Sequence, residues 1–426
     1  MTPSARLAAA IALLEEIEAA PRRPADAVAN EFFRSRRYIG GGDRRAVGER
    51  AWAVLRARRR IGWWLDFAQL PQTPRLLVAA SLLLEGATLE HLGRAFSGGQ
   101  YAPPALARAE ADMLAALAGR TLDFKAQPLP VRLEVPDWIA PRLAARFGDD
   151  LVPEMRAALD PAPLDLRANL LKATRDEARA ALAQEGIEAE PTPYSPWGLR
   201  VAGRRAVTTG AAFRDGLVEI QDEGSQLVAL LAGAEPGMRV ADWCAGAGGK
   251  TLALAMTMGN KGQLLACDVS APRLDGAVRR LRRAGVHNAE RHLVEPGDKW
   301  AKRRAGTFDR VLVDAPCTGT GTWRRNPDAR ARLREQDLAE LLPKQAAILD
   351  DAARLVKPGG RMIYATCSVL TEEDEDQVGA FLARQPGFAP VAAALPGGLE
   401  ADPYLFLTPR RHGTDGFFAA VLERRE

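Results

Sequence analysis

Cysteine and histidine are scarce in this sequence, which has four of each among its 426 residues. The cysteines are Cys244, Cys267, Cys317 and Cys367, and no two of them form a C-x-x-C pair. Zinc sites and disulfide frameworks need closer or more numerous Cys and His residues, so we expect neither a metal nor a disulfide. Unpaired cysteines in a chain of this length are typical of a reducing compartment.

Long apolar runs are also missing from the N-terminal region. The run at residues 76–84 is interrupted by Ser81 and is too short to span a bilayer. Residues 1–20 carry Glu15, Glu16 and Glu18 at the place where a signal peptide has its apolar segment. We therefore expect a cytoplasmic protein without membrane contact.

The excess of positive charge is small, 58 basic against 54 acidic residues, so only clusters of charge are informative about partners. Arginines cluster within 34–37, 44–45 and 56–60. All three clusters lie between residue 5 and about 125, where apolar residues recur at helical spacing. Arginine-rich helix faces are either solvated or in contact with RNA phosphates and bases. The sequence leaves both interpretations open for this all-helical region.

Residues 126 to about 212 have a different pattern. Residues 126–130, which include two prolines, form a linker. Further along, apolar and polar residues alternate as in a strand at 164–169, a helix is predicted at 174–184, and another strand begins at Gly186. This pattern predicts a small α+β unit. The aromatic and basic residues at 197–201 form either a base-stacking surface or a packed strand.

From residue 213 onward strands and helices alternate, which predicts a doubly wound, mostly parallel sheet of the α/β class. The predicted strands are 239–243, 263–267, 290–295, 309–314 and 361–366. The predicted helices include 271–284, 336–356 and 372–384, the last with Thr371 as its N-cap. The chain is thus expected to contain domains at 1–125, 126–212 and 213–426.

The first strand-to-helix turn of this last region, residues 244–251, is rich in glycine. A phosphate-binding loop would need glycine at position 244 and a dinucleotide fingerprint would need it at 251, but these positions hold Cys244 and Thr251. What remains is a turn at which the backbone can approach a nucleoside. Asp268 follows the next predicted strand, where a carboxylate suits a ribose diol. S-adenosylmethionine, a nucleoside without a pyrophosphate, fits this pattern.

Two more predicted strands lead into residues that can perform chemistry. The apolar run 311–313 precedes Asp314, with Pro316 and Cys317 just beyond, and the strand 361–366 precedes Cys367. Ligands of open α/β sheets bind at the carboxyl ends of the strands, so one carboxylate and two thiols are predicted to share one rim. The alternative is structural: a capping aspartate, and cysteines buried as small apolar residues.

Several stretches together resemble the Sun/Fmu family of RNA cytosine-5 methyltransferases. They are Asp314-Ala-Pro-Cys317 with residues 318–321, Thr366-Cys367-Ser368, the turn at 244–250, the Gln-Asp-Glu-Gly-Ser at 221–225 and the closing 411–418. The resemblance implies a Rossmann-like methyltransferase domain over residues 213–426. Residues 126–212 resemble the family's RNA-binding subdomain, and residues 1–125 resemble a NusB-like RNA-binding domain through 42–45 and 54–56.

The resemblance also implies roles for the matching residues. Cys367 would be the nucleophile, Cys317 would assist product release, Asp314 would hydrogen-bond the cytosine edge, and Lys250 would join them as a catalytic residue. S-adenosylmethionine would be held by Cys244, Ala245, Gly246, Ala247, Gly248, Gly249, Lys250, Asp268, Asp314 and an acid after the third strand. That acid is Glu295 or Asp298, and we favour Glu295 because it ends the predicted strand.

The implied reaction accounts for two thiols. Carbon 5 of cytosine is a poor nucleophile until a thiolate adds to carbon 6, and the adduct must later lose the carbon 5 proton and expel the thiolate. The implied partner is RNA, either 16S rRNA or a small-subunit assembly intermediate, and we expect a monomer. Two alternatives remain: a non-catalytic RNA-binding assembly factor, and a methyltransferase for tRNA or DNA. A DNA enzyme would use Cys317 as its nucleophile and would not need Cys367.

Overall fold

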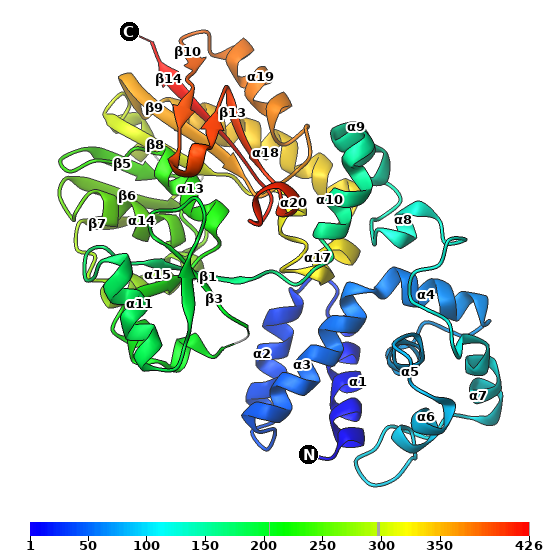
Figure 1. Cartoon of the computed structure of the whole chain (residues 1–426). Helices are drawn as coiled ribbons and strands as arrows, with labels where there is room; N and C mark the ends of the chain where they lie inside the picture. The colour runs from blue at the N-terminus through cyan, green and yellow to red at the C-terminus, as the bar shows by residue number, and fades with distance from the viewer. Residues whose placement is uncertain (204, 296–298, 426) are drawn as a thin grey trace. The chain divides into compact units, whose positions relative to one another are not determined.

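The structure, a computed structural model, describes residues 1–203, 205–295 and 299–425 (Figure 1). The chain divides into two compact units. The first contains Met1–Leu159 and Arg325–Arg334, and the second contains Asp160–Arg324 and Glu335–Glu426. A short segment from the second half of the sequence therefore folds with the N-terminal helices.

The first unit is helical, as the apolar spacing of residues 5–125 predicted. Its central helix is α5 (Pro74–Leu84), which is buried from Leu76 to Leu84 and contacts α1, α3, α4 and α6. Proline at the first position and the Thr73 hydroxyl, which accepts the Leu76 N–H, start this helix. The other helices are α1 (Pro3–Ala19), α2 (Ala25–Ser35), α3 (Gly41–Arg56), α4 (Arg58–Phe67), α6 (Leu89–Ala95), α7 (Arg108–Leu114), α8 (Leu129–Arg132), α9 (Ala140–Phe147), α10 (Leu151–Ala157) and α17 (Pro327–Arg332).

Helix α17 belongs to the first unit although its sequence follows the Cys317 loop of the second. It packs on α3, and the Asp328 carboxylate accepts the backbone N–H of Ala25, at the start of α2, at 3.0 Å. Arg332 donates to the same carboxylate at 2.8 Å. Because Ala25 and Asp328 are 303 positions apart, no local sequence pattern could have predicted this contact.

The second unit contains a small antiparallel sheet with the strand order β2-β3-β1-β4. Its strands are β1 (Leu164–Ala168), β2 (Ala189–Pro191), β3 (Gly198–Val201) and β4 (Val218–Ile220). Helix α11 (Arg175–Gln184) packs on it through Ala178 and Leu182, and Thr174 with Glu177 forms its capping box. The predicted strand at 164–169 and helix at 174–184 are confirmed, whereas the strand predicted from Gly186 begins only at Ala189.

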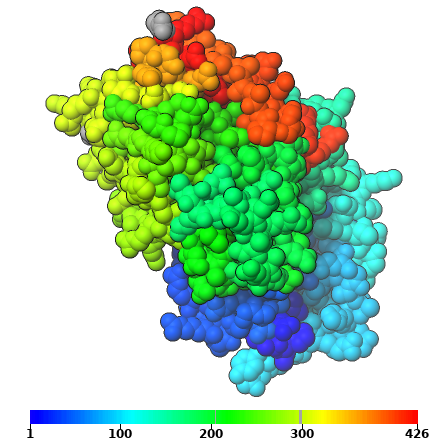
Figure 2. All heavy atoms as spheres, turned by 60° about the vertical axis from the view of Figure 1, so that its left-hand side comes forward, coloured from blue at the N-terminus to red at the C-terminus, as the bar shows by residue number. Residues whose placement is uncertain are grey.

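The aromatic and basic residues at 197–201 are packed, so the stacking-surface interpretation is wrong. Trp197 is buried in an apolar cluster with Ala229 of α13 (Glu223–Leu231) and Ala253 of α14 (Gly249–Thr257). Arg200 is paired with Asp165 at 2.7 Å. In the space-filling view the small sheet and the segment that follows it form one continuous packed surface, green to yellow-green (Figure 2).

The large sheet has the strand order β10-β14-β9-β8-β5-β6-β7, with β13 also paired to β14. Strands β9, β8, β5, β6 and β7 are parallel, and β14 joins β9 antiparallel. This confirms the predicted doubly wound, mostly parallel α/β sheet. The strands are β5 (Arg239–Asp242), β6 (Gln263–Asp268), β7 (Ala289–Leu293), β8 (Phe308–Asp314), β9 (Val356–Thr366), β10 (Phe388–Pro390), β13 (Tyr404–Leu407) and β14 (Phe417–Arg424).

Helices cover both faces of the large sheet because its central strands are apolar on both sides. Val311 and Val313 pack toward α18 (Glu335–Ala353) and α19 (Glu375–Arg384), whereas Leu312 packs with α13 and α14. The remaining helices of this part are α15 (Ala271–Ala284), α16 (Trp300–Arg303) and α20 (Pro409–His412). None of the helices in the described residues is long and apolar enough to cross a membrane.

Two predicted helix boundaries are wrong. The helix predicted at 336–356 ends at Ala353, because Val356 already pairs with Phe308 in the sheet. The helix predicted at 372–384 begins at Glu375 with Asp374, not Thr371, at the N-cap. The Thr371 carbonyl instead accepts the N–H groups of Asp374 and Asp376 in a preceding turn.

Candidate active site

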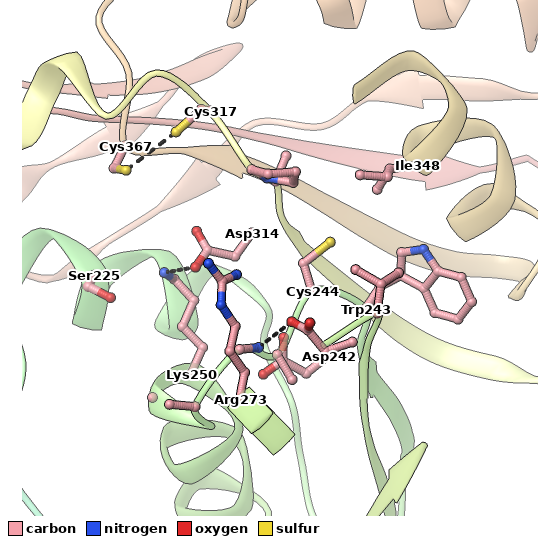
Figure 3. A pocket seen from close by; sticks show the side chains of 18 of the residues that line it. Ser225, Asp242, Trp243, Cys244, Lys250, Arg273, Asp314, Cys317, Ile348 and Cys367 are labelled. Atoms are coloured by element: carbon pink, nitrogen blue, oxygen red, sulfur yellow. Dashed lines mark hydrogen bonds and ion pairs between the residues drawn. The ribbon is translucent and has the colours of Figure 1, made fainter. Parts of the chain in front are cut away.

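A cavity of about 520 Å³ lies at the carboxyl ends of β5, β6, β8 and β9, within the second unit (Figure 3). Parallel pairing places these ends together: Asp242 is level with Leu312, and Asp314 with Ala365. Most of the predicted site residues line the cavity. They are Cys244, Ala245, Gly246, Ala247, Gly249, Lys250, Asp268, Asp314, Cys317 and Cys367.

The glycine-rich turn has two residues in the left-handed region. Gly246 and Gly248 have φ values of +54° and +80°, which side chains rarely adopt. A Cβ on Gly246 would meet open space, whereas a Cβ on Gly248 would lie 3.1 Å from the Cβ of Ala277 on α15. Gly248 therefore serves close packing against a helix, which explains why it does not line the cavity.

The Asp268 carboxylate holds this turn against β6. One of its oxygens accepts the Gly246 N–H at 2.8 Å and the other accepts the Ser270 N–H at 2.8 Å. Asp268 also lines the cavity. The acid that the sequence assigned to a ribose therefore has a second task, which is to fix the turn.

Lys250 and Asp314 form an ion pair on the cavity wall. The Lys250 ammonium lies 2.6 Å from an Asp314 carboxylate oxygen and 5.5 Å from the centre of the Phe417 ring. Lys250 is buried, so its charge requires such a partner. Figure 3 shows this pair close to the two sulfur atoms.

The two thiols face each other across the ends of β8 and β9. The sulfur atoms of Cys317 and Cys367 are 3.3 Å apart (Figure 3). The hydrogen bond to Cys367, together with burial, raises the pKa of Cys317 well above its ordinary value. Cys317 therefore keeps its proton and can donate its S–H to the Cys367 sulfur.

Cys244 also lines the cavity, but it is a poor candidate for a nucleophile. Burial, reinforced by the nearby Asp242 and Asp314 carboxylates, raises the pKa of its thiol. A neutral thiol at this position contributes to the shape of the cavity wall.

Sequence reasoning missed Asp242, the last residue of β5. It is fully buried, and its carboxylate accepts the Thr251 hydroxyl at 2.6 Å with one oxygen, while the other oxygen has no hydrogen-bond partner among the described residues. Burial raises its pKa to about 7. The signal was present, because Asp242 ends a parallel strand just as Asp268 and Asp314 do. Other lining residues missed were Gln221, Ser225 and Arg273.

The strand end predicted at Glu295 is wrong. Strand β7 ends at Leu293, and Val294, whose N–H donates to the Asp268 carbonyl at 2.9 Å, lines the cavity instead. Successive side chains of an extended segment point to opposite sides, so Glu295 is exposed. Asp298 lies outside the described residues. Among the residues that the structure describes, no cluster of His, Cys, Asp or Glu could hold a metal ion.

The fold and the rim of acids and thiols define a class, the Rossmann-like methyltransferases. Residues 229–423 match the model of the 16S rRNA methyltransferase RsmB/F family, and residues 135–208 match the ferredoxin-like domain of RsmF/B-like methyltransferases. The chain belongs to this RsmB/F family, which confirms the resemblance found in the sequence.

The similarity to individual proteins agrees with this family assignment. Ribosomal RNA small subunit methyltransferase B of Photorhabdus laumondii is 33% identical over 297 residues, which cover 68% of this chain and 66% of that protein. The solved structure of PH0851 has a TM-score of 0.79 at 27% identity and covers 100% of this chain and 99% of its own. A methyltransferase homolog from Pyrococcus horikoshii has a TM-score of 0.60 at 29% identity and covers 69% and 97%. The chain thus spans slightly less than two thirds of the length of the curated relative.

Proposed function

We propose that this protein transfers a methyl group from S-adenosylmethionine to carbon 5 of a cytosine in RNA, with 16S rRNA as the substrate. The observation that carries the proposal is the pair of thiols 3.3 Å apart in one cavity with a glycine-rich turn and the Lys250–Asp314 ion pair. Family membership supports the same activity, and the curated relatives are named as ribosomal RNA methyltransferases.

The cofactor side of the cavity fits S-adenosylmethionine. In our proposal the Asp268 carboxylate, which lines the cavity, binds the ribose, and the open side of Gly246 lets the cofactor approach the backbone. The unpartnered Asp242 oxygen can accept a hydrogen bond from a cationic amino group. When bound, the cofactor supplies an electrophilic methyl group.

The target base would occupy the thiol side of the cavity. In our proposal Cys367 forms a bond from its sulfur to carbon 6, which makes carbon 5 nucleophilic, while Asp314 hydrogen-bonds the cytosine edge and Lys250 holds Asp314 in place. After methyl transfer a solvent base takes the carbon 5 proton, the electron pair of that C–H bond forms the carbon 5–carbon 6 double bond, and the sulfur–carbon bond breaks to return Cys367 as a thiolate. In the same proposal Cys317 assists this last step, which its sulfur, 3.3 Å from that of Cys367, supports. A base in structured rRNA must leave its stack to reach the cavity.

The roles of the two thiols can be distinguished by running each cysteine variant on a denaturing gel after incubation with 16S rRNA and S-adenosylmethionine. Cys367→Ala should abolish methylation and form no covalent RNA adduct. Cys317→Ala should still attack and methylate but release slowly, so a denaturant-resistant protein–RNA band should accumulate. A DNA-type mechanism, with Cys317 as nucleophile, predicts the reverse. An RNA-binding assembly factor predicts no band and no 5-methylcytosine with any variant, and tRNA in place of 16S rRNA tests the substrate.

A further inference from the structure

Two adjacent buried acids, Glu373 and Asp374, stand between β9 and α19 and do not line the cavity. Both are fully buried. Asp374 occupies the N-cap of α19 but makes no side-chain capping hydrogen bond there. Burying a carboxylate costs free energy unless it accepts hydrogen bonds. The donors to Glu373 and Asp374 therefore indicate the roles of these two acids.

Glu373 is linked to the residues on both sides of Cys317, directly to Thr318 and through Gln345 to Pro316. One oxygen accepts the Thr318 N–H at 2.8 Å, and the other accepts the Thr318 hydroxyl. Gln345 of α18 donates to Glu373 at 3.0 Å and to the Pro316 carbonyl at 3.0 Å. The residues before and after Cys317 are therefore tied, directly or through one amide, to a single carboxylate.

Asp374 holds the residues around Cys367 in the same way. Its carboxylate accepts the Thr366 hydroxyl at 2.6 Å. That hydroxyl in turn accepts the Ser368 N–H at 3.2 Å, which closes the turn that carries Cys367. The two acids are neighbours in sequence, and their contacts differ in emphasis. Glu373 is tied to both sides of Cys317 and also hydrogen-bonds the Ser368 side chain beside Cys367, whereas Asp374 holds Thr366 on the other side of Cys367.

The two cysteine loops also touch each other. The Gly321 N–H donates to the Cys367 carbonyl at 2.9 Å, and the Thr318 and Ser368 hydroxyls are 3.4 Å apart. Gross damage to either loop would therefore disturb both. Variants of the same shape are needed to loosen one anchor while the other stays intact.

We propose that Glu373 and Asp374 are positioning residues with separate tasks: Glu373 sets Cys317 for product release, and Asp374 sets Cys367 for attack on the base. This assignment rests on the proposed function. Each acid acts through the loop that it holds and touches no reacting atom, so each should affect one step of the reaction and leave substrate binding unchanged.

The test uses Glu373→Gln and Asp374→Asn in the full chain, with 16S rRNA and S-adenosylmethionine. Glu373→Gln should accumulate the denaturant-resistant RNA adduct and slow turnover by about 10- to 100-fold, the usual effect of a lost charged hydrogen bond. Asp374→Asn should slow adduct formation by a similar factor, roughly 10- to 100-fold, without accumulating adduct. KM for RNA should stay unchanged in both.

A second layer of the test places these changes in the Cys317→Ala protein. There Glu373→Gln should slow the appearance of the band much less than Asp374→Asn does, because the thiol that Glu373 mainly positions is already gone and its remaining contact to the Cys367 loop is the Ser368 side chain. Thr318→Val and Thr366→Val remove the contacted hydroxyls and should reproduce the two effects more weakly, even if a carboxylate variant fails to fold. Glu340→Gln, at an exposed acid of α18, is the control and should behave like wild type.

Equal loss of activity in both variants, without adduct in either, would overturn the division of tasks and leave a merely structural role. The same holds if Glu373→Gln slows the band in the Cys317→Ala protein as much as Asp374→Asn does. An absence of 5-methylcytosine and of adduct in wild type and Cys317→Ala is a different result, because it overturns the proposed function itself and this inference with it.

Discussion

Residues 34–45 and residues 56–60 of the helical unit are both rich in arginine, but their guanidinium groups have different partners. Arg58, Arg59 and Arg60 pair with Glu18, Asp137 and Glu134, and Arg56 donates to the Leu159 carbonyl. By contrast, Arg34, Arg37 and Arg45 are exposed and make no hydrogen bond or ion pair with any residue that the structure describes.

This difference shows how to interpret a run of charges. The arginines of the second run make their contacts within the helical unit. The buried Glu134 accepts the backbone N–H groups of Arg59 and Arg60 as well as the Arg60 side chain. The first run is used only in part. Arg36 pairs with Glu16 and Arg44 donates to the Ile39 carbonyl, whereas Arg34, Arg37 and Arg45 leave their charge available near Tyr38, which is 74% exposed. A charge with partners inside the chain stabilises the fold, and one without them is available to a ligand.

The largest effect is expected at the buried ion pair of Arg60 and Glu134. Glu134→Gln should destabilise the helical unit by about 3 to 5 kcal/mol, because it leaves the buried Arg60 guanidinium with the more exposed Asp123 as its remaining counter-charge. Hydrogen exchange of α4, measured by mass spectrometry, would report the loss. Arg34→Ala is the matched control and should leave exchange unchanged. Similar protection in both variants would mean that the two arginine runs do not differ in structural role.

The next largest effect is expected at Asp242 in the cavity wall. Only one of its two carboxylate oxygens accepts a hydrogen bond from a residue that the structure describes. Its pKa in the folded protein, about 7, exceeds the ordinary 3.8, so the neutral acid is the form that the fold stabilises. That stability is complete below the ordinary pKa and is lost as pH rises through about 7. Asp242→Asn should therefore flatten the pH dependence of stability, a difference of up to about 4 kcal/mol between wild type and variant.

Urea denaturation at a series of pH values measures this slope, and Asp275→Asn, an exposed acid of α15, is the control. S-adenosylmethionine should bind wild type more tightly as pH rises through 7, because its amino group favours the ionised Asp242. A pH-independent affinity in wild type would remove Asp242 from the cofactor site.

The same contrast explains how much of the site could be predicted from sequence. Asp268, Asp314, Cys317 and Cys367 were predicted because each stands at or just beyond the end of an apolar strand, and strand ends of a parallel sheet meet at one rim. Asp242 also stands at the end of an apolar strand. It was not predicted, because the prediction for this region rested on the glycine-rich turn that follows it.

Other features had no local signal. The position of α17 depends on Asp328 meeting Ala25 across 303 residues. Glu373 and Asp374 resemble ordinary acids at the start of a helix, and only the direction of their side chains shows that they hold the cysteine loops. The sequence therefore predicts which residues can react, whereas the residues that position them appear only in the structure.

A smaller effect is expected at Asp268, whose carboxylate is satisfied by two backbone N–H groups and also faces the cavity. Asp268→Ala should weaken S-adenosylmethionine binding by about 1 to 3 kcal/mol through the lost charged hydrogen bonds. Calorimetry at constant pH measures this affinity. Glu295→Ala, at an exposed position outside the cavity lining, should show no change; equal losses in both variants would contradict the placement of these acids.

The smallest effect on the protein itself is expected for the exposed arginines. Replacing Arg34, Arg37 and Arg45 together by alanine should leave thermal stability within about 0.5 kcal/mol of wild type, because surface changes without partners cost little. RNA affinity should fall, and the slope of log affinity against log salt should decrease by up to about 3, roughly one for each lost phosphate contact. Filter binding of 16S rRNA across a salt series measures both quantities. Arg59→Ala is the control, since its guanidinium already has Asp137 as a partner and its loss should not change the slope. An unchanged slope in the triple variant would mean that residues 34–45 do not contact RNA, and that their free charge serves another ligand.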